Sequence, residues 1–229
     1  MFVLVLVAFL LHYSSARDSK AIIGCDGVEI VSREEWRARP SVRERHMNLP
    51  INHIIILHTV TPFCRTKQQC IRHVQFIQDF HLDERGWWDI GYNFLVGGDG
   101  RIYEGRGWNR TGAFSVNFNT NSIGLSFIGN FNNDVPTQSM VNAALNFIKC
   151  GVQKGTLTPT REIHGHKDVS CTESPGNKLY AVIRQWDNYK GGRMPLYNCK
   201  PLPKPETNTD ILDVGSNEGS TDKPSERDK

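Results

Sequence analysis

The sequence predicts an α/β fold in which a central mixed β-sheet is flanked by helices. Short apolar runs rich in β-branched residues alternate along the chain with longer stretches in which apolar residues recur at helical spacing. These segments show neither a strict strand-helix-strand repetition nor an internal repeat, which favours a mixed sheet. The length of 229 residues and the hydrophobic content of 38% indicate one domain with additional segments at its ends.

The first strand and the first helix follow one another closely. Residues 53–57 contain three successive isoleucines and a leucine, a continuous apolar run that is typical of a central strand buried on both faces. A helix is predicted over residues 67–82, because apolar residues recur there every third position. The side chains expected to point inward from this helix are Ile71, Val74, Ile77 and Phe80.

The remaining elements are predicted by turn chemistry and by further apolar periodicity. Residues 97–100 read Gly-Gly-Asp-Gly and favour a hairpin turn, because Gly and Asp tolerate positive φ. The flanking strands are then residues 92–96 and 101–104. Further elements are expected as a strand over 123–128, a helix from Pro136 and Thr137 to near Gly151, a strand over 162–166 and a helix over 177–186. In the helix before Gly151 the inward face is expected to hold Met140, Val141, Ala144, Leu145 and Ile148.

Both ends of the chain are expected to lie outside the folded domain, which should span residues 17–199. Residues 1–16 read as a signal peptide, because an apolar run of about ten is shorter than the ~20 residues of a spanning helix and Ser14-Ser15-Ala16 follows it. We therefore expect a secreted, extracellular protein, with a membrane anchor as the alternative. Residues 200–229 are polar and lack aromatic residues, which predicts a disordered tail.

Neither charge nor hydropathy indicates a nucleic-acid or membrane partner. The net charge of +3 is too small for a dedicated nucleic-acid-binding protein, which carries a concentrated basic face. No stretch after the N-terminal run approaches ~18 uninterrupted apolar residues, so no membrane span is expected.

The six cysteines favour disulfides in an oxidising compartment. The chain has six cysteines, all after the predicted signal peptide, and an even number can pair completely in disulfides. Six cysteines allow 15 different pairings. Cys64 and Cys70 enclose a short loop and are the expected partners of one bridge. The absence of a Cys-x-x-Cys pair argues against a cysteine-cluster zinc site.

Several segments together resemble one family, the peptidoglycan recognition proteins of animal innate immunity, which share the fold of type 2 zinc amidases. The segments are IIILHTVTPFC, GWWDIGYNFLVGGDGRIYEGRGWN, NSIGLSFIGNF, CGVQKGTL and GHKDVSCTESPGNKLY, and they cover about residues 25–190 in family order. The resemblance implies a muramyl-peptide groove on an amidase-like fold. It also implies that Cys25 pairs with Cys150, which leaves Cys171 with Cys199.

The resemblance argues against catalysis by this chain. Enzymes of the family hold a catalytic zinc with two histidines and a cysteine, and the matching positions here carry Leu57, His166 and Ser174. Leucine has no lone pair, and a neutral serine hydroxyl is a far poorer zinc donor than a thiolate. A rescue through His164, His166 and His58 would require neighbouring positions to be re-aimed. We expect no catalytic residues, no metal and no cofactor.

The resemblance also implies which residues line the groove. Most of these residues match family positions that hold the muramyl peptide stem. One departure is Phe114, which stands where the family usually has histidine. The implied ligand-binding residues are His58, Thr59, His81, Arg85, Gly86, Trp87, Tyr92, Arg106 and Asn109.

Two of these matches favour diaminopimelate-type stem peptides over lysine-type ones. Arg106 matches the arginine that contacts the extra carboxylate of diaminopimelate, and a guanidinium grips a carboxylate through two hydrogen bonds. Gly86-Trp87 resembles the Gly-Trp pair of diaminopimelate binders. Asn109-Arg110-Thr111 is in addition an N-glycosylation sequon whose occupancy is left open.

Three functions are compatible with this pattern. The first is a secreted pattern-recognition receptor that binds bacterial peptidoglycan without cleaving it and acts on downstream immune signalling proteins or a protease cascade. The second is a zinc-dependent N-acetylmuramoyl-L-alanine amidase, which Leu57 and Ser174 oppose. The third is an interaction protein that kept the fold and lost the ligand. Because most of the implied ligand-binding residues of the groove are present, we favour the non-cleaving receptor.

Overall fold

The centre of the fold is a mixed sheet, as predicted, and its six strands lie in the order β1-β4-β3-β5-β2-β6. The computed structural model describes residues 25, 27–195, 197 and 199, so the predicted signal peptide and polar tail lie outside the described residues. The strands are β1 (Ile30–Val31), β2 (Ile51–His58), β3 (Phe94–Val96), β4 (Ile102–Glu104), β5 (Ser122–Phe127) and β6 (Leu157–Gly165). β3 and β4 pair antiparallel through the predicted hairpin, whereas the other neighbours are parallel. The short strand β1 was not predicted.

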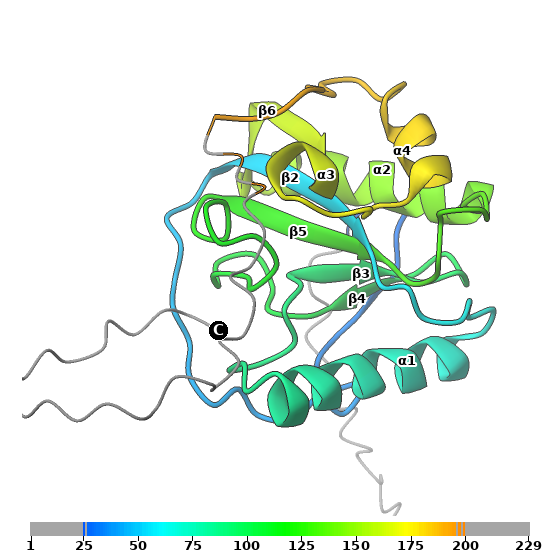
Figure 1. The fold of residues 1–229 in the computed structure, drawn as a ribbon. Helices are drawn as coiled ribbons and strands as arrows, with labels where there is room; N and C mark the ends of the chain where they lie inside the picture. Colours follow the sequence, from blue (N-terminus) through cyan, green and yellow to red (C-terminus); the bar gives the residue numbers. More distant parts are fainter. Residues whose placement is uncertain (1–24, 26, 196, 198, 200–229) are drawn as a thin grey trace, which may run out of the picture.

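Helices cover both faces of the sheet (Figure 1). On one face lies α1 (Lys67–Asp79), which continues into a π-helical turn, η1 (Phe80–Glu84). On the other face lie α2 (Gln138–Gln153) and α4 (Asn177–Ile183), whose apolar side chains join one cluster with the sheet. A single turn, α3 (His166–Val169), follows β6 directly. None of the described helices is both long and apolar enough to span a membrane.

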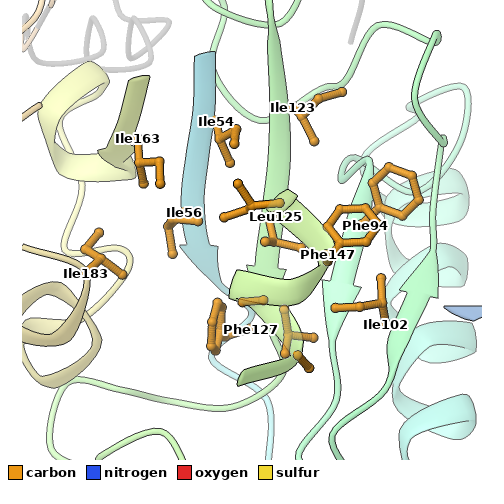
Figure 2. Packing of buried hydrophobic residues seen from close by; sticks show 14 of the residues in the cluster. Ile54, Ile56, Phe94, Ile102, Ile123, Leu125, Phe127, Phe147, Ile163 and Ile183 are labelled. Atoms are coloured by element: carbon orange, nitrogen blue, oxygen red, sulfur yellow. The ribbon is translucent and has the colours of Figure 1, made fainter. Parts of the chain in front are cut away.

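Strand β2 is buried on both faces, as its composition predicts. Ile54 and Ile56 point into the cluster formed with α2 and α4 (Figure 2). Ile55 and Leu57 alternate with them and join a separate cluster. Because successive strand residues face opposite sides, this alternation decides which face of the sheet Leu57 occupies.

The predicted inner face of the first helix is wrong at its end. Ile77 is buried, but Phe80 is 38% exposed. The reason is that every third residue drifts by about 60° around a helix of 3.6 residues per turn, so Phe80 lies at the border of the apolar face. The buried stripe instead centres on Cys70, Val74 and Ile77.

Two further elements differ from prediction, α2 in its inward face and β6 at its end. Helix α2 begins where predicted, because the side chain of Thr137 accepts a hydrogen bond from the amide of Met140, but Leu145 is exposed rather than inward. His166 opens α3 instead of ending the strand. The Asp168 carboxylate accepts a hydrogen bond from the Gly165 amide at 2.7 Å and so ends the extended chain there.

Three disulfides are formed among the described residues. Cys64 is bonded to Cys70, as the short loop predicts; both are buried, and Cys70 lies in the first turn of α1. The pairs implied by the resemblance, Cys25–Cys150 and Cys171–Cys199, are also present.

Candidate functional site

A groove with a volume of about 590 Å³ opens at the carboxyl ends of β2 and β6. Its walls come from the end of β2 and the loop after it, from α1 and η1, and from the segment that follows α3. The parallel pairing of β2 with β5 and β6 brings these segments to the same edge of the sheet. The structure thus places a cleft where polar loops meet, which is the usual position of a ligand site in such sheets.

The structure brings most of the implied groove residues together. Six of them line the groove: His58, Thr59, His81, Arg85, Trp87 and Tyr92. Gly86 joins two of these residues at a φ of +62°, a conformation that favours glycine, but it does not itself line the groove. Arg106 and Asn109 also lie outside the lining residues.

One wall of the groove is an aromatic stack centred on His81. The ring of His81 stacks on Trp87 with centroids 4.5 Å apart and meets Tyr92 edge-on at 5.6 Å. His81 Nδ1 accepts a hydrogen bond from the Gly91 amide at 3.0 Å, which orients the ring. Burial raises the pKa of Tyr92, so its hydroxyl remains a hydrogen-bond donor at neutral pH.

Three groove histidines are held neutral by their surroundings, and burial lowers the pKa of one of them, His166, to about 4. Burial, reinforced by the positive charges of Arg106 and Arg85 and opposed by Asp89, lowers the pKa of His81 to about 4. Burial, reinforced by Lys167, lowers the pKa of His58 to about 4. The ring of His58 is oriented by its Nδ1, which accepts a hydrogen bond from the Phe131 amide at 3.2 Å. At neutral pH this part of the groove offers uncharged hydrogen-bonding rings.

We expect the stability of the protein to fall as the pH is lowered from about 6.5 to about 4. The unfolded chain binds protons at His58, His81 and His166 below their ordinary pKa of 6.5, whereas the folded chain does not bind them until about pH 4. Each histidine should contribute about 1.4 kcal/mol per pH unit within that window and nothing further above it. Urea unfolding at a series of pH values measures the slope.

Asparagine replacements at two of these positions test which histidines cause this slope. His81→Asn and His58→Asn keep a hydrogen-bond acceptor near the position of Nδ1 but cannot titrate, so each should reduce the slope by one proton. His46→Asn alters an exposed histidine and is the control. An unchanged slope in both groove variants would contradict the assignment.

The three positions that hold zinc in the resembling enzymes come together in the groove. Leu57, His166 and Ser174 all line it. His166 Nε2 lies 2.9 Å from the carbonyl of Phe114, which can only accept, so Nε2 carries the proton. Its Nδ1 is buried and has no hydrogen-bond partner among the described residues. One zinc donor is therefore retained in an orientation that keeps its lone pair available.

The other two positions do not fit a zinc ion. Leu57 is buried and offers no donor atom. The hydroxyl of Ser174 accepts a hydrogen bond from the His58 amide at 3.2 Å and is a neutral oxygen rather than a thiolate. One imidazole does not make the three-ligand site that a catalytic zinc requires.

Phe114 fills part of the groove floor where the family usually has histidine. A Cβ on Gly124 would lie 2.5 Å from a ring carbon of Phe114, so the ring packs directly on the β5 backbone. This packing explains why glycine stands at position 124. It also places an apolar ring where the family has a polar contact.

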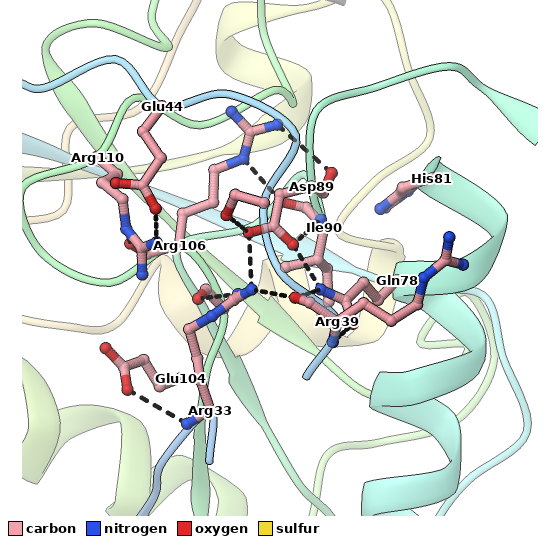
Figure 3. A network of polar contacts seen from close by, with 12 residues as sticks. Arg33, Arg39, Glu44, Gln78, His81, Asp89, Ile90, Glu104, Arg106 and Arg110 are labelled. Atoms are coloured by element: carbon pink, nitrogen blue, oxygen red, sulfur yellow. Dashed lines mark hydrogen bonds and ion pairs between the residues drawn. The ribbon is translucent and has the colours of Figure 1, made fainter. Parts of the chain in front are cut away.

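Arg106 lies outside the groove lining, in a buried polar network. Its guanidinium, in a residue only 5% exposed, donates to the carbonyls of Ile90 at 2.8 Å and Thr111 at 2.7 Å, and more distantly to that of Asp89 at 3.4 Å. The Asp89 carboxylate in turn binds Arg33 at 2.9 Å (Figure 3). The charge of Arg106 contributes to the lowered pKa of His81, so its field reaches the groove although its side chain does not line it.

Asn109 is exposed, and its carbonyl accepts a hydrogen bond from the Met47 amide at 2.7 Å. It stands outside the groove lining, so both its implied contact with the ligand and the use of its sequon stay predictions.

The groove also has an apolar rim, which was not predicted from the sequence. Phe76 and Phe80 are one helical turn apart, line the groove and are 64% and 38% exposed. Val60, also exposed, adjoins the groove from the loop after β2. The available signal was the position of Phe76, a large aromatic residue off the buried stripe of its helix.

Comparison with known proteins agrees with the class that this fold and groove define. The sequence profile of the family described as N-acetylmuramoyl-L-alanine amidase matches residues 47–177. A peptidoglycan recognition protein of Trichoplusia ni is 43% identical over 160 residues, which cover 70% of this chain and 88% of that protein. The chain belongs to the peptidoglycan recognition protein family.

Solved structures of the family share the architecture. The structure of bumblebee PGRP-SA superposes with a TM-score of 0.71 at 42% identity and covers 72% of this chain and 99% of that one. Peptidoglycan recognition protein LE, solved in complex with tracheal cytotoxin, a monomeric diaminopimelic acid-type peptidoglycan, superposes with a TM-score of 0.69 at 38% identity, covering 70% of this chain and 95% of that one.

Proposed function

We propose that this chain binds bacterial peptidoglycan in the groove and does not cleave it. The observation that carries the proposal is the combination found in one cavity: the ring and hydroxyl groups that can hold a muramyl peptide are retained, whereas two of the three zinc positions are Leu57 and Ser174. Recognition needs shape, stacking and hydrogen bonds, all of which remain. Hydrolysis needs an activated water, for which no metal-binding donor set is present at these positions.

The proposed ligand is the diaminopimelate type of peptidoglycan. The complex of protein LE with such a fragment, on a related chain of the same fold, supports this choice. Gly86-Trp87 and Arg106 support it from the sequence, and the positive charge of Arg106 helps to lower the pKa of the groove residue His81. We propose that the extra carboxylate of diaminopimelate pairs with this charge and that part of the Arg106 network rearranges to meet it.

The amidase alternative is favoured by one observation, the buried and unpartnered Nδ1 of His166. A single surviving donor is also what a former zinc site would leave behind after two ligands were replaced. We therefore interpret His166 as part of the groove wall rather than as a catalytic ligand.

We also propose that the protein is secreted and passes a binding signal to other proteins of the immune response. Three disulfides support an oxidising compartment. A binder without catalytic activity needs a second protein to act on its signal, which supports downstream signalling proteins or a protease cascade as partners.

Sedimentation with insoluble diaminopimelate-type peptidoglycan tests the proposal. The natural chain should co-sediment in the presence of a chelator and release no soluble muramyl product. A chain that kept the fold and lost its ligand would remain in the supernatant, and chelator-sensitive product would support the amidase instead.

Truncating the aromatic rim should weaken this binding. Phe76→Ala together with Phe80→Ala removes exposed rings from the groove edge and should lower the affinity about tenfold, which corresponds to about 1.4 kcal/mol. The free energy of unfolding should change by less than about 0.5 kcal/mol for each exposed site. Leu145→Ala, a comparably exposed residue on α2 across the sheet, is the matched control. Equal sedimentation of the double variant and the control would show that the rim makes no contact.

A further inference from the structure

Three metal-ligating side chains meet on β2 and β6, outside the groove. His53 is in register with Glu162, and Ile55 is in register with His164. Residues two apart on a strand share a face, so the side chains of His53, Glu162 and His164 project from the same face of the sheet. Their ligand atoms lie within 4.8 Å of one another. None of the three residues lines the groove.

The three ligand atoms form a nearly regular triangle. His53 Nδ1 lies 3.2 Å from His164 Nε2, and the Glu162 carboxylate oxygen lies 3.6 Å from each of these nitrogens. A triangle with these sides has a circumscribed radius of about 2.0 Å, which equals the distance at which zinc binds imidazole nitrogen and carboxylate oxygen. A cation of that size would touch all three atoms with little movement of the side chains.

His164 is oriented as a metal ligand would be. Its Nδ1 lies 2.8 Å from the carbonyl of Lys190, which can only accept, so Nδ1 carries the proton and the lone pair of Nε2 faces His53 and Glu162. The amide of Lys190 donates to the carbonyl of Ile163 at 2.8 Å, which holds the accepting carbonyl in place. Histidine ligands in metal sites are typically oriented by such a second hydrogen bond.

Hydrogen bonding alone accounts for only part of this arrangement. A proton on His53 Nδ1 could bridge the 3.2 Å to His164 Nε2, but the Glu162 oxygen, at 3.6 Å from both nitrogens, is beyond hydrogen-bond distance of either. Both contacts of the carboxylate are at ion-pair distance, and a cation shared by the three groups would hold all of them at these positions. The side chains of His53 and Glu162 are 17% and 32% exposed, so solvent and an entering ion can reach the site.

We propose that His53, Glu162 and His164 bind a divalent transition-metal cation of the zinc class. Two imidazoles and one carboxylate suit zinc, and a fourth position remains for water on the exposed side. The ion would link β2 to β6 and, through His164, to the segment at Lys190. It would therefore stabilise the folded chain without taking part in peptidoglycan binding.

Calorimetric titration of the full-length chain with Zn²⁺ tests the site, using protein freed of metal by a chelator and carrying no histidine tag. We expect one bound Zn²⁺ per chain and a higher midpoint of thermal unfolding in its presence. Loss of an outer-shell partner typically weakens metal binding by about 10–100-fold, so loss of a direct ligand should weaken it at least about tenfold. His53→Gln and Glu162→Gln should each show this loss.

Two control variants decide between this site and others. His166→Gln removes the surviving donor of the groove, and His46→Gln removes an exposed histidine elsewhere. Both should bind Zn²⁺ as the natural chain does. The proposal is overturned if the natural chain binds no stoichiometric Zn²⁺, or if Glu162→Gln binds it unchanged while retaining its metal-free unfolding midpoint. Peptidoglycan sedimentation in chelator is unaffected by either result, so the failure of one proposal leaves the other standing.

Discussion

The combined replacement Leu57→His and Ser174→Cys should convert the groove into a zinc site, whereas the natural chain should bind no zinc there. The two new side chains would join His166, whose Nδ1 is buried and has no described partner. Together they supply two imidazoles and a thiolate, the set that the resembling enzymes use. All three positions already line one cavity, so no change of fold is needed.

The effect should be strongly non-additive. Each single variant adds one donor and leaves the site a ligand short, so the double variant should bind Zn²⁺ at least about 100-fold more tightly than either single variant. The measurement belongs in a Glu162→Gln background, so that the cluster on β2 and β6 does not contribute to the titration. We expect the double variant to bind zinc even if it does not hydrolyse peptidoglycan. Hydrolysis also requires that the residues around the metal be placed to activate the bound water.

The same experiment can contradict the interpretation. If the natural chain releases muramyl sugar and peptide from peptidoglycan, and a chelator stops the release, then Leu57 and Ser174 do not prevent catalysis. If the double variant folds normally and binds no more zinc than the single variants, the three positions are not aligned as the resemblance implies.

Arg106→Ala should abolish the preference for diaminopimelate over lysine in the stem peptide. Losing a charged hydrogen-bond partner at a partly desolvated site commonly costs about 2–5 kcal/mol, or about one and a half to three and a half decades of affinity. The lysine-type ligand lacks the extra carboxylate, so its affinity should change little. Titration of both fragments against the natural chain and the variant measures the ratio directly.

The buried position of Arg106 makes this ratio more informative than either affinity. The variant also removes donors from the carbonyls of Ile90 and Thr111, so it should lower the free energy of unfolding as well. Damage to the groove floor would weaken both ligands alike, whereas a direct ion pair weakens only one. Equal weakening, or a natural preference for the lysine type, would show that Arg106 supports the floor and does not select the ligand.

Local sequence patterns were sufficient to predict most of the fold. The apolar run of β2, the Gly-Gly-Asp-Gly hairpin and the Thr137 cap act over a few residues, and the structure confirms each. The Cys64–Cys70 bridge closes a short loop and is local in the same sense. The resemblance added the two distant disulfides and six residues that line the groove.

The tertiary structure decided the direction in which each side chain points and the residues that it contacts. Phe80 turned from the expected core to the groove rim because a three-residue period drifts around a helix. Arg106 proved to be buried among main-chain carbonyls, which no pattern in its neighbourhood indicates. His53 and His164 are 111 positions apart, and only the register of β2 against β6 brings them together with Glu162. The sequence by itself determined most of the elements, because these follow from residue type and local spacing, and the resemblance implied which side chains stand at the zinc positions. The tertiary structure alone decided the convergence of distant side chains, because strand register is set by the packing of the whole sheet.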